Sequence, residues 1–144
     1  MPLFKYTTQI DADKTAANIT RMLSKAGARS VLTEYDEEGA YITSISFKIN
    51  TGDQDLFIKL PCNWRAVLTI LIDDRKVPSK YKTSDQAIRV SWKIIEAWVQ
   101  AQVAIIQTNM VRTEEIFLPY IVTRDGQTLF EKIKGQQYLL SSGN

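Results

Sequence analysis

Three neighbouring segments constrain the fold of this chain more than any other feature of its sequence: two have alternating polar and apolar residues, and residues 30–35 are rich in β-forming residues. The clearest is residues 41–49; residues 30–35 precede it across the acidic turn 36–39, and residues 56–60 follow it across the turn 50–53. Alternation with a period of two is typical of strands that bury one face. Turns this short place consecutive strands antiparallel, so we predict that these segments form a meander.

One further strand and one helix are predicted before the meander. Residues 4–10 alternate like a short strand. The apolar residues between 19 and 26 recur at helical spacing, with Asp11 or Asp13 as the helix cap and Gly27 as the stop.

The second half of the chain is predicted to be helical. Asn63 is placed to cap a helix over 64–73, and the capping-box sequence at 83–86 opens a long helix that reaches about Met110. Shorter helical segments follow near Glu114 and after Thr128.

Together these segments predict an α+β fold in the order β-α-β-β-β followed by helices. We expect an antiparallel meander sheet packed against a C-terminal helical half with one long apolar helix. No linker or internal repeat interrupts residues 1–140, which we expect to be a single α+β domain, with 141–144 as a flexible tail.

The residue counts exclude several classes of catalytic site. The 144 residues contain no histidine and one cysteine, so Ser-His-Asp, Cys-His and histidine-bearing zinc sites are excluded. Cys62 lies at the start of a predicted helix, which would lower its pKa, but without a histidine base we expect a buried structural thiol. We predict a protein that is not an enzyme and holds no cofactor and no metal; a magnesium-dependent nuclease around Asp53 and Asp55 is the weakest alternative.

The long predicted helix carries two apolar faces on either side of a polar stripe. A helix on a sheet needs only one apolar face. Two interpretations follow: the C-terminal helices cover the second face, or that face is the interface of a homo-oligomer with Trp92 as its anchor. The face in question consists of Ile88, Trp92, Ile95, Val99, Val103 and Ile106.

The densest basic segment of the chain gives the leading candidate site. The net charge is only +2, yet this segment contains a single acid, Asp85. Its cations would contact phosphates and its tyrosine would stack on a base; solvated surface charge is the plainer explanation. The predicted nucleic-acid-binding residues are Arg75, Lys76, Lys80, Tyr81, Lys82, Arg89 and Lys93.

A second candidate site is a pocket lined by Trp64, Arg65 and Tyr81, where an indole and a guanidinium meet at a helix start. Such a corner would grip a nucleotide, although it also serves as a helix cap that closes the core. The corresponding function is a protein that occupies a host immune protein or sequesters a nucleotide signal.

A set of segments along the chain forms a familiar pattern: 57–61, 86–92, 98–102, Met110 and 116–120. Together they resemble a group of small proteins carried on bacteriophages, prophages and other mobile elements. The likeness runs from Lys5 to about Lys132, and no catalytic residues can be carried over from it. It implies an accessory protein in the cytoplasm of a bacterial host cell, where no membrane partner is expected, and it favours binding over catalysis.

Overall fold

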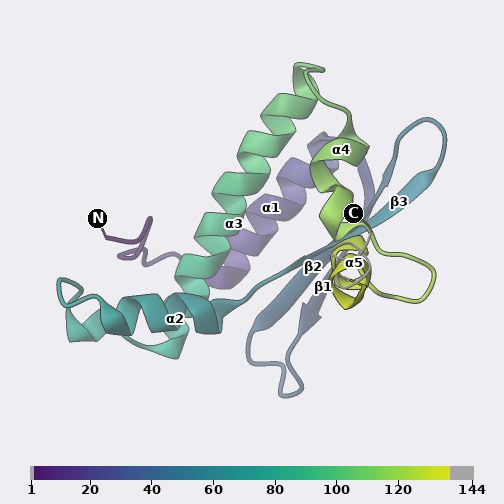
Figure 1. Cartoon of the computed structure of the whole chain (residues 1–144). Coiled ribbons are helices and arrows are strands. Elements are labelled where there is room, and N and C mark those ends of the chain that lie inside the picture. The colour runs from purple at the N-terminus through teal and green to yellow at the C-terminus, as the bar shows by residue number, and fades with distance from the viewer. Residues whose placement is uncertain (1, 137–144) are drawn as a thin grey trace, which may run out of the picture.

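A three-stranded antiparallel sheet with helices on both of its faces forms the centre of the structure (Figure 1). The structure is a computed structural model that describes residues 2–136, and it confirms the α+β class. Its elements, in chain order, are α1 (Ala12–Lys25), β1 (Ala28–Tyr35), β2 (Ile42–Asn50), β3 (Asp55–Pro61), α2 (Trp64–Asp73), the 3₁₀ turn η1 (Ser79–Tyr81), α3 (Ser84–Gln107), α4 (Thr113–Phe117), the 3₁₀ turn η2 (Leu118–Tyr120) and α5 (Leu129–Gly135).

The predicted meander is present, with β2 between β1 and β3. Phe47 of β2 lies opposite Val31 on one side and Ile58 on the other, which fixes the register of the sheet. Because side chains alternate across a strand, the odd residues of β2 from Ile45 to Ile49 point to one face and are buried there.

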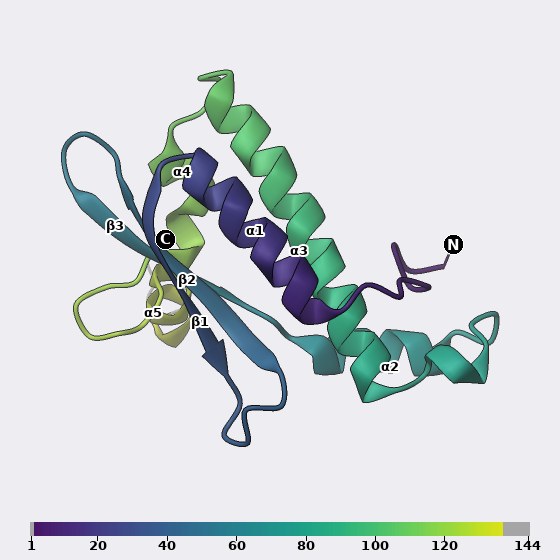
Figure 2. The same ribbon diagram turned by 180° about the vertical axis from the view of Figure 1, so that it is seen from behind.

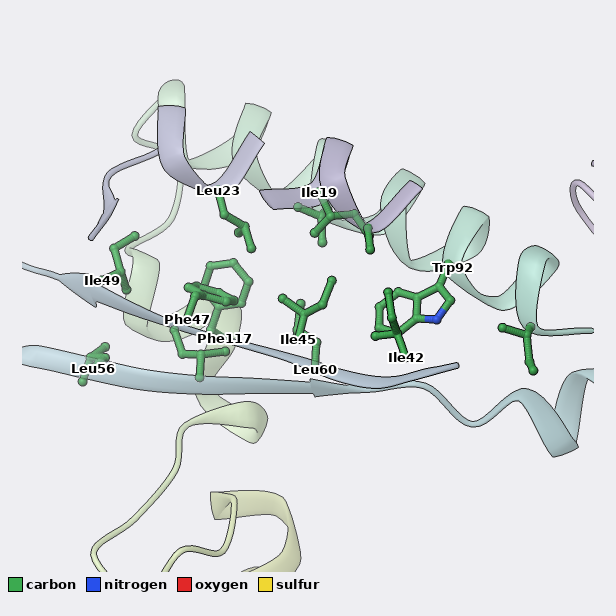
Figure 3. Packing of buried hydrophobic residues seen from close by; sticks show 14 residues of the cluster. Ile19, Leu23, Ile42, Ile45, Phe47, Ile49, Leu56, Leu60, Trp92 and Phe117 are labelled. Carbon is green, nitrogen blue, oxygen red and sulfur yellow. The ribbon is translucent and has the colours of Figure 1, made fainter. Parts of the chain in front are cut away.

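Helices α1 and α3 lie side by side over this buried face and run in the same direction (Figures 1 and 2). The amide of Asn18 on α1 donates a hydrogen bond to Glu96 Oε2 on α3 at 2.8 Å, which ties the two helices together. Ile19 and Leu23 of α1 point down onto the sheet beside Trp92 of α3 (Figure 3). At the far end of the core, Phe117 of α4 packs edge-to-face on Phe47, with 5.3 Å between ring centroids.

The chain then passes the β3 edge to the opposite face of the sheet, where α5 lies (Figures 1 and 3). On the way, Ile121 pairs with Ile58, and the Val122 N–H donates to the Phe57 carbonyl at 2.7 Å. The β3 edge is therefore covered by the chain itself.

The prediction of a strand at residues 4–10 is wrong, because the sheet has three strands and this segment forms turns. Two backbone carbonyls of this segment accept hydrogen bonds from a side chain instead of from a neighbouring strand. The buried side chain of Gln86 donates from Nε2 to the carbonyls of Tyr6 and Thr8 at 2.8 and 2.9 Å. A single side chain of α3 thus takes the place of a neighbouring strand.

The prediction that the long helix is apolar is also wrong. Helix α3 spans 24 residues, but its buried residues gather in its first two thirds and include the polar Gln86 and Ser91. Further along, Gln100, Ala101 and Ala104 are exposed. The start of the helix packs against α2 and α1, and its end projects beyond α1 (Figure 1).

The face of α3 predicted as an oligomer interface lies inside the chain's own core, which corrects that prediction. Ile88, Trp92 and Val99 belong to the buried cluster, and Ile95, Val103 and Ile106 pack against it. Trp92 has no exposed surface, and its indole Nε1 has no hydrogen-bond partner among the described residues. A side chain buried this deeply is not available to anchor a second molecule.

Candidate nucleic-acid interface

The cations of the predicted basic segment divide into two groups. Arg75 and Lys76 lie on the turn that ends α2, Lys80 lies in η1, and Lys82 follows it. All but the half-buried Lys82 are exposed. Among residues 2–136, none of these side chains lies within salt-bridge distance of a carboxylate, so none of their charges is held in an ion pair.

Arg89 and Lys93 do not belong with them. Arg89 donates from Nε and Nη2 to Gln86 Oε1 at 3.0 and 2.8 Å, and it lines a small hollow with Asp11, Asp13 and Asp85. Lys93 forms an ion pair with Glu96 at 2.9 Å, with both side chains only 15% exposed. Both cations are engaged within the fold, so the structure corrects their assignment to a binding surface.

The structure adds a cation that the sequence pattern missed. Tyr6 packs edge-to-face on Tyr81 with 5.5 Å between ring centroids, which brings the N-terminal segment against η1. Lys5, the neighbour of Tyr6, is exposed and has a left-handed backbone conformation, with φ of 63°. No local signal marks Lys5, because the contact that places it here joins positions far apart in the sequence. We call Lys5, Arg75, Lys76, Lys80 and Lys82 the basic cluster.

The aromatic residue best placed for stacking is Phe4 rather than Tyr81. Tyr81 is half-buried against Leu71, Val77 and Ala87, and its ring also packs on Tyr6. Its ring is therefore occupied by intramolecular contacts. Phe4 is 53% exposed, and Lys5 Nζ lies 5.5 Å from its ring centroid, so an aromatic face and a cation occur together at the surface.

The predicted pocket at Trp64, Arg65 and Tyr81 receives no support from the contacts of these residues. Trp64 packs edge-to-face on Tyr41 at 5.7 Å, and the Arg65 guanidinium lies 4.6 Å from the Trp64 ring centroid. Tyr81 uses a different partner, Tyr6. Trp64 and Tyr81 pack against the core, as the plainer interpretation predicts for Trp64, and Arg65 is exposed over the Trp64 ring.

Within the described part of the chain, no group of three or more carboxylate or thiol side chains is arranged to hold a metal ion. Asp55, proposed as a nuclease carboxylate, accepts a hydrogen bond from the Asn50 amide at 2.9 Å in the turn before β3. None of the helices in residues 2–136 has the length and apolar character needed to cross a membrane.

Comparison of the chain with protein-family models, with curated proteins and with solved structures found no match. The likeness to mobile-element proteins therefore stays a prediction from the sequence, and the function has to be argued from the surface of the molecule.

Proposed function

We propose that the protein binds single-stranded nucleic acid, without a chemical step, through the basic cluster and the adjacent ring of Phe4. The observation that carries the proposal is the contact between Tyr6 and Tyr81, which gathers cations from two distant segments at one end of the molecule.

The cations of the basic cluster are free to bind phosphates. Cations that already hold an ion pair, such as Lys93, have little to gain from a phosphate, whereas the basic cluster has no such pairs among the described residues. Phosphates that bind there release condensed counterions, which supplies most of the affinity of such sites. Asp73 and Asp74 lie beside Arg75, so the net field is moderate, and we expect binding that is strong only at low salt.

The exposed ring of Phe4 favours single strands over duplexes. An unpaired base offers its flat face to an exposed ring, and stacking of this kind contributes about 1–3 kcal/mol per base. Phe4 presents such a ring next to Lys5. A duplex keeps its bases stacked on one another, so it would use the cations alone.

The test is fluorescence anisotropy with labelled single- and double-stranded oligonucleotides over a series of salt concentrations. For the chain as it stands we expect tighter binding to the single strand, with log K falling against log salt at a slope of about −2 to −4, because each phosphate contact contributes about −0.7. The absence of binding at the lowest salt concentration would refute the proposal.

Charge-reversal variants distinguish binding at the basic cluster from attraction by the overall charge of the protein. We expect Lys76→Glu with Lys80→Glu to abolish measurable binding, and Phe4→Ala to weaken single-strand binding roughly 5- to 100-fold while leaving duplex binding unchanged. The matched control reverses two exposed cations elsewhere, Arg124 and Lys134. If this control lost as much affinity as the first double variant, binding would not occur at the basic cluster.

A further inference from the structure

One edge of the sheet, β3, is covered by a later segment of the chain, whereas the other edge, β1, is open in the described residues. Ile121 and Val122 cover the β3 edge. Strand β1 has β2 as its only neighbour in the described sheet, and its other side pairs with nothing in residues 2–136. An edge strand presents a row of backbone N–H and C=O groups that can pair with another chain.

The register shows which of these groups are free. Thr43 accepts from the Cys62 N–H and the Thr51 N–H donates to Gln54, so the odd residues along β2 direct their hydrogen bonds towards β3. Its even residues bond towards β1, where their partners are Ser30, Leu32 and Glu34. The residues between these, Val31 and Thr33, therefore point their N–H and C=O groups outward from the sheet.

The features that usually protect an edge strand are missing from the middle of β1. Natural edge strands carry proline, lysine or inward-pointing charges that prevent pairing. Residues 30–33 contain none of these, and the register irregularities of β1 fall towards its two ends. Leu32 is 61% exposed on the face away from α1, where it borders an apolar hollow of about 370 Å³ shared with Phe57 and Val122.

We propose that a second copy of this chain binds along β1 in antiparallel orientation, about a two-fold axis at Leu32, and joins the two sheets into one. Val31 of each copy then lies opposite Thr33 of the other, and these pairs use the free backbone groups. Leu32 lies opposite its own equivalent on the outer face, at a position where side chains of an antiparallel pair come closest.

Charge complementarity identifies a second copy as the occupant. The start of β1 is basic, with Lys25 at the end of α1, Arg29 on the strand, and Lys48 beside Ser30 on β2. Its end is acidic because the turn after β1 holds Asp36, Glu37 and Glu38; Glu34 itself is paired with Lys59 within the chain. Antiparallel pairing of two identical strands places each basic end against the acidic end of the other copy, so the favourable contact occurs twice.

The first experiment is the measurement of mass in solution by light scattering during size-exclusion chromatography, over a dilution series. We expect a dimer that dissociates on dilution, and a monomer for Leu32→Asp, since two like charges would meet on the axis. Leu32 is exposed, so circular dichroism of this variant should show an unchanged fold. A monomer at every concentration of the unmodified chain would overturn the proposal, and so would a dimer that survives Leu32→Asp.

Crosslinking tests the register itself. Opposed side chains at such a position have Cβ atoms about 4.5–5.5 Å apart, close to the 3.5–4.5 Å typical of a disulfide. We expect Leu32→Cys to give a covalent dimer when diamide takes up the two thiol hydrogens. The control is Ser46→Cys, next to Leu32 on the same face but on the central strand. Pairing along β1 would be contradicted if both variants crosslinked equally, or if neither of them crosslinked.

Discussion

Cys62 illustrates at the scale of one residue how two opposing effects are decided by the tertiary structure. Its place just before α2 favours a lowered thiol pKa, since the positive end of a helix stabilises a thiolate. Burial acts in the other direction because it removes water from the charged form. Burial wins: it raises the pKa of Cys62 from 9.0 to about 11, against smaller opposing contributions from hydrogen bonds to Ser91 and to the Trp64 backbone.

We therefore expect Cys62 to be almost inert towards a thiol reagent at neutral pH and to react faster as the pH rises towards 11. The raised pKa also determines how the stability of the fold changes with pH. The unfolded thiol ionises near pH 9 while the folded one stays neutral, so the free energy of unfolding should fall between about pH 9 and 11. Labelling rates with an aromatic disulfide over a pH series measure the first effect, and Cys62→Ser, which should lose this part of the pH dependence, checks the second. A thiol that reacts as fast in the folded as in the unfolded chain would contradict the assignment.

At the scale of elements, Gln86 decides how the N-terminal segment is attached to α3. Its amide donates to two carbonyls of that segment and its Oε1 accepts from Arg89. The same side chain thus uses both ends of the amide, and it attaches the N-terminal segment that carries Lys5 to α3. The basic cluster depends on this link between elements as much as on its own cations.

Gln86→Leu should lower the free energy of unfolding by about 1–3 kcal/mol, because it removes hydrogen bonds to the half-buried polar partners of Gln86. Gln86→Glu is the informative control: it keeps an acceptor for Arg89 but removes the donor to Tyr6 and Thr8. We expect both variants to lose hydrogen-exchange protection over residues 2–10, and urea denaturation gives the stability change. If Gln86→Glu protected this segment as well as the unmodified chain does, the carbonyl contacts would not be what holds it.

At the scale of the whole molecule, Phe117 joins the core on one face of the sheet to the chain that continues onto the other. It is buried against Phe47 and Trp98, at the point where α4 leads past the β3 edge. The position of α5 on the far face and the covering of the β3 edge both follow from this anchor.

We expect Phe117→Ala to destabilise the protein by about 3–5 kcal/mol, the usual cost of removing a fully buried aromatic ring. Its neighbour Leu118 is 48% exposed, so Leu118→Ala should cost much less. Urea denaturation of the two variants gives the comparison, and similar losses for both would show that Phe117 is not the anchor of α4.

The sequence by itself determined the elements whose signals are local. The meander follows from alternation and short turns, α2 begins after Asn63 and α3 after Thr83 as the caps predict, and Gly27 takes the left-handed conformation that ends α1. Each of these features depends on the backbone and on side chains within a few residues. For that reason it can be found without knowing which segments meet.

Only the tertiary structure decided the rest, because it depends on contacts between distant positions. The alternation of residues 4–10 was overridden by the side chain of Gln86. The apolar face around Trp92 is covered by α1 and the sheet rather than by another molecule. The basic segment was divided, since Arg89 and Lys93 found partners in the fold while Lys5 joined from the N-terminus. Charge and apolar patterns in the sequence indicate which residues need a partner. Tertiary packing decides whether that partner is another residue of the same chain or another molecule.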